Sequence, residues 1–222
     1  MTGFLFRLMP LLVVLGSVSG CAGLSTLTSV TAPTDLYTLT PKSTFDPALP
    51  RLRQQIVVQE PTATAAVSND RIAVQPSPLQ VEYLSGARWV DLAPVIIQAL
   101  LIESYENSGK VDAVGRSAVS LRADYLIVTD LREFQARVPP AVAENDRLQV
   151  QVRLNFKLVN ADVDRIIASR SFEEIVDTQS DDAGDIALAF DQALGSVMRD
   201  AVEWSIREMH ADALERPAAL ED

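Results

Sequence analysis

The sequence contains a single cysteine, Cys21, and the residues before it suit a chemical modification of its thiol. Arg7 and an apolar run over residues 8–18 precede it in the layout of a signal peptide, and the run is too short to span a bilayer. The small pair Ser19-Gly20 stands directly before the cysteine. A peptidase that cuts before a modified cysteine needs small residues on its amino side, so the layout predicts a signal peptide over residues 1–20.

The stretch Val18-Ser19-Gly20-Cys21 resembles the lipobox of bacterial lipoproteins. The resemblance implies cleavage between Gly20 and Cys21 and a covalent diacylglycerol and N-acyl chain on Cys21. One fatty chain binds a membrane only marginally, at about 0.8 kcal/mol per buried methylene, whereas two or three make attachment effectively permanent. Ala22 stands where an aspartate would favour retention at the inner membrane, so we expect the periplasmic face of the outer membrane. The alternative is an ordinary secretory signal with a leftover cysteine.

Catalytic residues are sparse in the rest of the chain. The one histidine, His210, lies near the end of the sequence, which leaves a serine nucleophile without a positioned base and disfavours most zinc chemistry. The sequence has no G-x-x-x-x-G-K-[ST] loop for nucleotide phosphates. Glu103 and Glu106 could form an acid–base pair, but their place on the polar side of an expected helix favours a solvated face. We therefore expect no enzymatic activity.

Four aspartates lie close together in the sequence: Asp177, Asp181, Asp182 and Asp185. Calcium binds several oxygens, but the glycine turn and distant glutamate of an EF-hand are missing. Aspartates at this place suit the amino terminus of the helix that follows, so capping is the favoured interpretation. We expect no metal, and no cofactor other than the covalent lipid.

The composition favours one ordinary domain. With 30 acidic and 19 basic residues the formal net charge is -11, which argues against nucleic acid or an anionic surface as the main partner. A single cysteine excludes a disulfide framework within the chain. We assign residues 21–34 to a lipidated tether, 35–209 to the domain and 210–222 to a disordered tail. Thirteen residues, 22–34, would reach about 45 Å when extended.

Hydrophobic periodicity within residues 35–209 predicts an α+β fold, with a mixed, largely antiparallel sheet and two main helices. One helix is expected from a cap at Asp91 to about residue 109, and the other after residue 182. The run 123–138 is apolar on both faces and suits a central strand, whereas residues 148–158 alternate strictly. With a third strand at 165–173 they form an antiparallel meander. Shorter strands are expected at residues 36–40, 55–59, 71–75, 81–84 and 110–114.

Two features are candidate contacts for a partner or lipid. Trp89, before the first helix, is either a surface anchor or a plug between helix and sheet, and the plug is favoured. The loop over residues 138–143 exposes apolar groups if it projects from the sheet, or else folds back onto it. Its candidate contact residues are Val138, Pro139, Pro140 and Val142.

The order of several weak motifs carries a second resemblance. Besides the lipobox, they are Leu36-Tyr37-Thr38-Leu39, Arg71-Ile72-Ala73-Val74, Tyr83, Arg88-Trp89-Val90-Asp91-Leu92, Ala123-Asp124-Tyr125-Leu126-Ile127-Val128, Phe134 and Ala168-Ser169-Arg170-Ser171-Phe172, followed by an Ala-rich closing helix. Together they resemble the ABC-type transport auxiliary lipoprotein family, which includes the paraquat-inducible lipoprotein. The similarity covers nearly all of residues 35–208.

The resemblance implies an accessory role in moving lipids between membranes. The expected partners are a mammalian-cell-entry-type substrate-binding protein, an inner-membrane permease and an ATPase, and the lipoprotein itself would bind no ATP. Some members of the family form rings, so a ring-shaped homo-oligomer is also an expectation. Two other hypotheses stay open: a structural envelope lipoprotein that binds cell wall or an outer-membrane assembly machine, and a periplasmic hydrolase, which the lack of a base disfavours.

Overall fold

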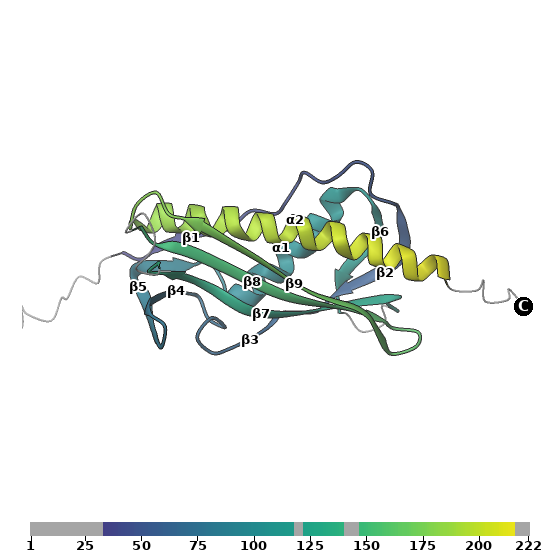
Figure 1. Cartoon of the computed structure of the whole chain (residues 1–222), viewed down its shortest axis with the longest axis horizontal. Coiled ribbons are helices and arrows are strands. Elements are labelled where there is room, and N and C mark those ends of the chain that lie inside the picture. Colours follow the sequence, from purple (N-terminus) through teal and green to yellow (C-terminus); the bar gives the residue numbers. More distant parts are fainter. Residues whose placement is uncertain (1–32, 118–121, 140–146, 216–222) are drawn as a thin grey trace, which may run out of the picture. The chain divides into compact units, whose positions relative to one another are not determined.

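Strand β7 (Tyr125–Arg137) lies at the centre of a nine-stranded mixed sheet. The computed structural model describes residues 33–117, 122–139 and 147–215 (Figure 1). One edge of β7 pairs antiparallel along its length with β8 (Gln149–Asn160). The other edge pairs in parallel with three short strands in turn, β2 (Leu52–Val58), β3 (Thr62–Ala63) and β4 (Arg71–Ser77). The structure confirms the central position expected from the apolar residues on both faces of β7.

The remaining strands extend the sheet outward from these neighbours. β9 (Arg165–Asp177) pairs antiparallel with β8 and completes the expected meander. β5 (Gln80–Trp89) forms a hairpin with β4, and β1 (Asp35–Tyr37) runs parallel to β5. β6 (Val111–Arg116) runs parallel to β2. The longest pairings are therefore antiparallel and the parallel ones are all short, which agrees with the α+β class predicted from the sequence.

Two helices cover one face of the sheet. Helix α2 (Ala183–Glu215) lies along β8 and β9, with α1 (Ala93–Ser108) beside it (Figure 1). The alternation in β8 explains this arrangement, because Val150, Val152, Leu154, Phe156 and Leu158 are all buried beneath the helices. Within residues 33–117, 122–139 and 147–215, no helix is both long and apolar enough to cross a bilayer.

The ends of α1 follow from local sequence. Pro94 stands in the first turn, where its missing N–H costs no helical hydrogen bond. The helix closes at Gly109, whose φ of 62° is left-handed, and the Gly109 N–H donates to the carbonyl of Glu106 at 3.0 Å. The capping residue is Leu92 rather than the expected Asp91. Asp91 Oδ1 instead accepts a hydrogen bond from the N–H of Leu92 at 2.7 Å.

Helix α2 continues six residues beyond Met209 to Glu215, so residues 210–215 belong to the helix and not to a disordered tail. The hydroxyl of Tyr125 donates to the Met209 carbonyl at 3.1 Å and to Asp212 Oδ2 at 2.8 Å. Asn160 Nδ2 donates to the same carboxylate at 2.9 Å. These bonds join the last turns of α2 to β7 and β8, and sequence periodicity alone does not show them. Residues 216–222 lie outside the described part.

Candidate functional site

The hairpin of β4 and β5 extends past the carboxyl end of β7. Gln75 in β4 is level with Arg137, the last residue of β7, and the two strands run in parallel. The residues after Gln75 therefore project beyond β7, and the hairpin turns between Ser77 and Gln80. We call residues 77–81 the hairpin tip. Gln75 Nε2 donates to the Pro78 carbonyl at 3.2 Å, which ties the tip to its own strand.

Apolar side chains of the hairpin tip lie in solvent. Leu79 is 100% exposed, and Val81 is also exposed. Val138, which follows β7, is 51% exposed and lies beside the hairpin, because its N–H donates to the Gln75 carbonyl at 3.3 Å. Pro139 is buried. The predicted contact residues Pro140 and Val142 lie outside the described residues.

A groove of about 510 Å³ separates the hairpin from the end of β7. The hairpin wall is formed by Gln75, Pro76, Ser77 and Pro78, and the sheet wall by Glu133, Arg137, Val138, Pro139 and Gln151. This hollow is formed by side chains from β4, β7 and β8 together. The parallel pairing of β4 with β7 is what brings the two walls together.

Arg137 gives the groove a cation. The side chain of Arg137 is half-buried, and its buried Nε has no hydrogen-bond partner in the part of the chain that the structure describes. The nearby carboxylate of Glu133 accepts hydrogen bonds from Arg153 Nη2 at 2.5 Å and from Gln135 Nε2 at 2.6 Å. Because Glu133 is already paired with Arg153, the guanidinium of Arg137 is available to an anion in the groove.

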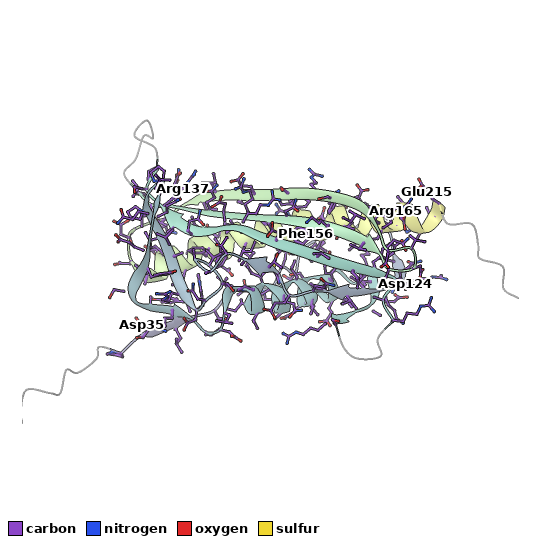
Figure 2. All side chains as sticks on the ribbon, turned by 90° about the horizontal axis from the view of Figure 1, so that it is seen from below. Asp35, Asp124, Arg137, Phe156, Arg165 and Glu215 are labelled. Atoms are coloured by element: carbon purple, nitrogen blue, oxygen red, sulfur yellow. The ribbon has the colours of Figure 1, made fainter. Side chains whose placement is uncertain are left out.

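Asp35 begins β1 at the same end of the sheet as Arg137, whereas Asp124, Arg165 and Glu215 lie at the opposite end (Figure 2). We call the first the tether end, because the chain reaches it from the predicted tether. β1 runs parallel to β5, with Asp35 beside Ala87 and Tyr37 beside Trp89. Gly20 and Cys21 lie outside the described residues.

Trp89 is a plug between helix and sheet, as the sequence favoured, and not a surface anchor. Its side chain is 1% exposed. The indole packs against Phe134 of β7 and Phe190 of α2, with ring centroids 5.7 Å and 5.1 Å away. The three rings bury apolar surface that would otherwise be exposed to solvent at the tether end of the core. Trp89 is thus removed from the candidate contact residues.

The face of the sheet opposite the helices is polar. Residues from β7, β8 and β9 alternate onto it, and neighbouring side chains pair across the strands. Asn155 Nδ2 donates to Ser171 Oγ at 3.0 Å, Gln149 Nε2 donates to Asp177 Oδ1 at 2.9 Å, and Gln151 donates to Glu173. These pairs link neighbouring strands, although the buried Asn155 Oδ1 has no hydrogen-bond partner among the described residues.

The residues considered for catalysis or metal binding do not assemble a site. His210 is half-buried on α2, and Glu103 and Glu106 are exposed on α1. No group of three or more His, Cys, Asp or Glu among the described residues could hold a metal ion. Burial raises the pKa of Tyr105 above its ordinary range. The Tyr105 hydroxyl lies 2.6 Å from Ser205 Oγ in the core, which makes it a packing residue.

The aspartates near the start of α2 serve the helix and the sheet. Ser180 Oγ donates to Asp185 Oδ2 at 2.6 Å, and the N–H of Asp182 donates to Ser180 Oγ at 3.1 Å. Asp185 lies in the first turn of α2, where a negative charge is favourable. Asp177 accepts from Gln149 in the sheet. This arrangement agrees with capping and not with a calcium loop.

A family model described as ABC-type transport auxiliary lipoprotein component matches residues 37–202. The chain belongs to this family. The family is one of lipoproteins and so of membrane-associated envelope proteins, it is linked by its description to ABC-type transport, and such auxiliary components are generally not enzymes.

Two solved structures and one curated relative are similar to this chain. A crystal structure of a protein from Xanthomonas campestris is 30% identical, with a TM-score of 0.76 over 82% of this chain and 99% of that one. A second, of an uncharacterized protein, is 12% identical with a TM-score of 0.60 over 78% and 99% of the two chains and shows the fold alone. An uncharacterized protein of Bradyrhizobium diazoefficiens is 27% identical over 83% of this chain. The chain spans about half (49%) of that relative's length.

Sequence reasoning found Val138 but missed the hairpin tip that faces it. The dipeptide Ser77-Pro78, between two strand-like runs, favours the start of a turn and would have located the tip. The groove has no comparable signal, because its two walls are distant in sequence.

Proposed function

We propose that this protein is a non-enzymatic accessory lipoprotein of an ABC-type system that moves phospholipids between membranes. It is held by lipid on Cys21 at the periplasmic face of the outer membrane. Its partners in this proposal are a mammalian-cell-entry-type substrate-binding protein, an inner-membrane permease and an ATPase. The match of the family model to residues 37–202 is the observation that carries the proposal.

The described residues support a binding role over a catalytic one. The groove at the tether end contains a cation and walls of mixed polar and apolar residues but neither a nucleophile–base pair nor a metal-ligand cluster from the described residues. A protein that binds or positions other components needs accessible surface of this kind, and it needs no strongly perturbed reactive group. Among the residues that the structure describes, the large pKa shift belongs to Tyr105, which lies in the core, away from the groove.

Affinity purification from cell envelopes in mild detergent tests the proposal. The tagged wild type is compared with Cys21→Ala, and co-purifying proteins and phospholipids are identified by mass spectrometry. We expect the wild type to recover a mammalian-cell-entry-type protein with phospholipid, and Cys21→Ala to recover much less while its circular dichroism stays unchanged. Recovery only of cell-wall or outer-membrane assembly components would contradict the transport role and favour a structural envelope lipoprotein.

A further inference from the structure

We propose that the hairpin tip and Val138 contact the surface of the phospholipid bilayer that anchors the chain, and that Arg137 binds a lipid phosphate there. The inference rests on the proposed lipid anchor at Cys21. It adds a second membrane contact, made by the folded domain itself.

The first argument is the character of the hairpin tip. Leu79 is 100% exposed, and Val81 and Val138 are exposed nearby, so their apolar area is available to a bilayer without any rearrangement. The sequence from Ile72 to Val81 contains no charged residue, although the whole chain carries a formal net charge of -11. The tip itself carries no charge, but Gln80 Nε2 donates to the carboxylate of the adjacent Glu82 at 2.5 Å, so the turn can enter the head-group region only as far as this carboxylate stays in water.

The second argument is where the tether begins. Asp35 and Arg137 lie at the same end of the sheet (Figure 2). Only thirteen residues separate Cys21 from Asp35, a reach of about 45 Å at full extension. An anchor on Cys21 therefore keeps Asp35 within about 45 Å of the lipid surface.

The third argument is charge. In a bilayer the phosphates lie just outside the apolar region, which is where a cation beside an inserted apolar turn would be placed. Arg137 lines the groove behind the tip, with a buried Nε that makes no hydrogen bond within the described residues. A guanidinium matches a phosphate in geometry and charge. Glu133, in the same groove, is paired with Arg153 and so opposes this contact less.

Because the chain is tethered to the membrane, a weak contact is sufficient to orient the domain. One exposed leucine and two valines would not hold a soluble protein on a membrane. Once Cys21 is anchored, the contact becomes intramolecular, and the short tether keeps the local concentration of lipid surface high. The contact would fix the orientation of the domain rather than its attachment.

Fluorescence quenching by lipid tests this in the full lipoprotein. The sulfur of an acylated Cys21 is a thioether and does not react with a thiol probe, so Leu79→Cys supplies the one labelling position. Val163→Cys, at another exposed apolar residue in the turn after β8, is the matched control. Each variant is labelled with an environment-sensitive dye and bound to vesicles of phosphatidylethanolamine and phosphatidylglycerol. Parallel vesicles carry brominated acyl chains as quenchers.

We expect blue-shifted emission at position 79 and several-fold stronger quenching by brominated lipid than at position 163. Arg137→Gln in the Leu79→Cys background is expected to reduce the quenching, and unchanged quenching would overturn the role of Arg137. If the labelled protein floats with the vesicles while the dye at position 79 stays in water, the proposed membrane contact is contradicted and the proposed lipid anchor is supported. If the protein does not float, the proposed anchor fails and the membrane contact fails with it.

Discussion

The two ends of the helix–sheet packing are held by different interactions. At the tether end, Trp89, Phe134 and Phe190 form an apolar aromatic cluster. At the opposite end, Tyr125 and Asn160 donate hydrogen bonds to the carboxylate of Asp212. The surfaces differ in the same sense: the hairpin tip at the tether end is uncharged and exposes Leu79 and Val81, whereas charged residues such as Asp162 and Arg122 lie at the opposite end.

Exposed apolar residues occur at both ends, so exposure alone does not identify a contact surface. Val163 is 61% exposed in the turn between β8 and β9, yet aspartates flank it on both sides. Asp162 there pairs with Arg122 at 3.4 Å. At the hairpin tip the flanking residues are proline and glutamine. The two turns therefore differ in the charge of the residues around them. The four experiments below test this description of the fold and of its two ends.

Replacing Trp89 by alanine should have the largest effect. Removing a buried aromatic side chain leaves a cavity that the two phenylalanines only partly fill, which costs about 3–5 kcal/mol of unfolding free energy. Urea unfolding followed by the fluorescence of Trp204 measures it. Val90→Ala is the control, because Val90 is the exposed neighbour on the other side of the strand end and should change stability by less than about 0.5 kcal/mol. Equal effects of the two substitutions would show that the cluster does not hold the tether end.

Replacing Tyr125 by phenylalanine tests the opposite end. It should lower the unfolding free energy by less than the Trp89 substitution does, by about 1–3 kcal/mol. The ring stays, but the Asp212 carboxylate and the Met209 carbonyl each lose a hydrogen bond. Hydrogen exchange should rise in the last turns of α2 and stay unchanged in its first turns near Phe190. Uniform loss of protection along α2 would contradict the view that the two ends are held separately.

The local sequence pattern was enough to predict the central strands of the sheet. It failed where contacts between residues distant in the chain determine the structure. The alternation in β8 and the apolar run in β7 predict both strands and their pairing. β5 was expected to end before Ser85-Gly86, but Gly86 has a φ of 73° and the strand continues to Trp89. A glycine in this conformation bends a strand without ending it, which composition cannot distinguish from a turn.

The groove and the end of α2 depend on contacts between residues far apart in the chain. Gln75 and Arg137 meet only through the parallel pairing of β4 with β7, whose register no local signal specifies. The last turns of α2 contain few apolar residues, so the sequence suggested a tail from residue 210. Bonds from Tyr125 and Asn160 to Asp212 supply the order that the local sequence does not show.

The third experiment concerns Tyr105, in the core between α1 and α2. Burial raises its pKa, so the folded protein keeps the hydroxyl proton at a pH where the unfolded chain loses it. The stability that this group contributes is complete below about pH 10, the usual pKa of tyrosine, and falls as the pH rises above it. Tyr105→Phe should flatten the alkaline fall in unfolding free energy, measured by urea titrations on either side of about pH 10.

At neutral pH the cost of Tyr105→Phe should be small, about 0.5–1.5 kcal/mol. Ser205, which faces the hydroxyl, keeps a second partner, because its Oγ donates to the Val202 carbonyl at 2.9 Å. If the unfolding free energy of Tyr105→Phe falls as steeply at alkaline pH as that of the wild type, groups other than Tyr105 cause the fall.

Replacing Leu79 by aspartate should have the smallest effect on folding, within about 0.5 kcal/mol, because the side chain is fully exposed. The measurement is made in the Cys21→Ser background, which carries no lipid, so that only the stability of the domain is recorded. Val163→Asp should behave alike. A cost above about 1 kcal/mol at Leu79 alone would instead mean that the hairpin tip packs against the domain in solution, and the contrast between the two ends would lose its functional meaning.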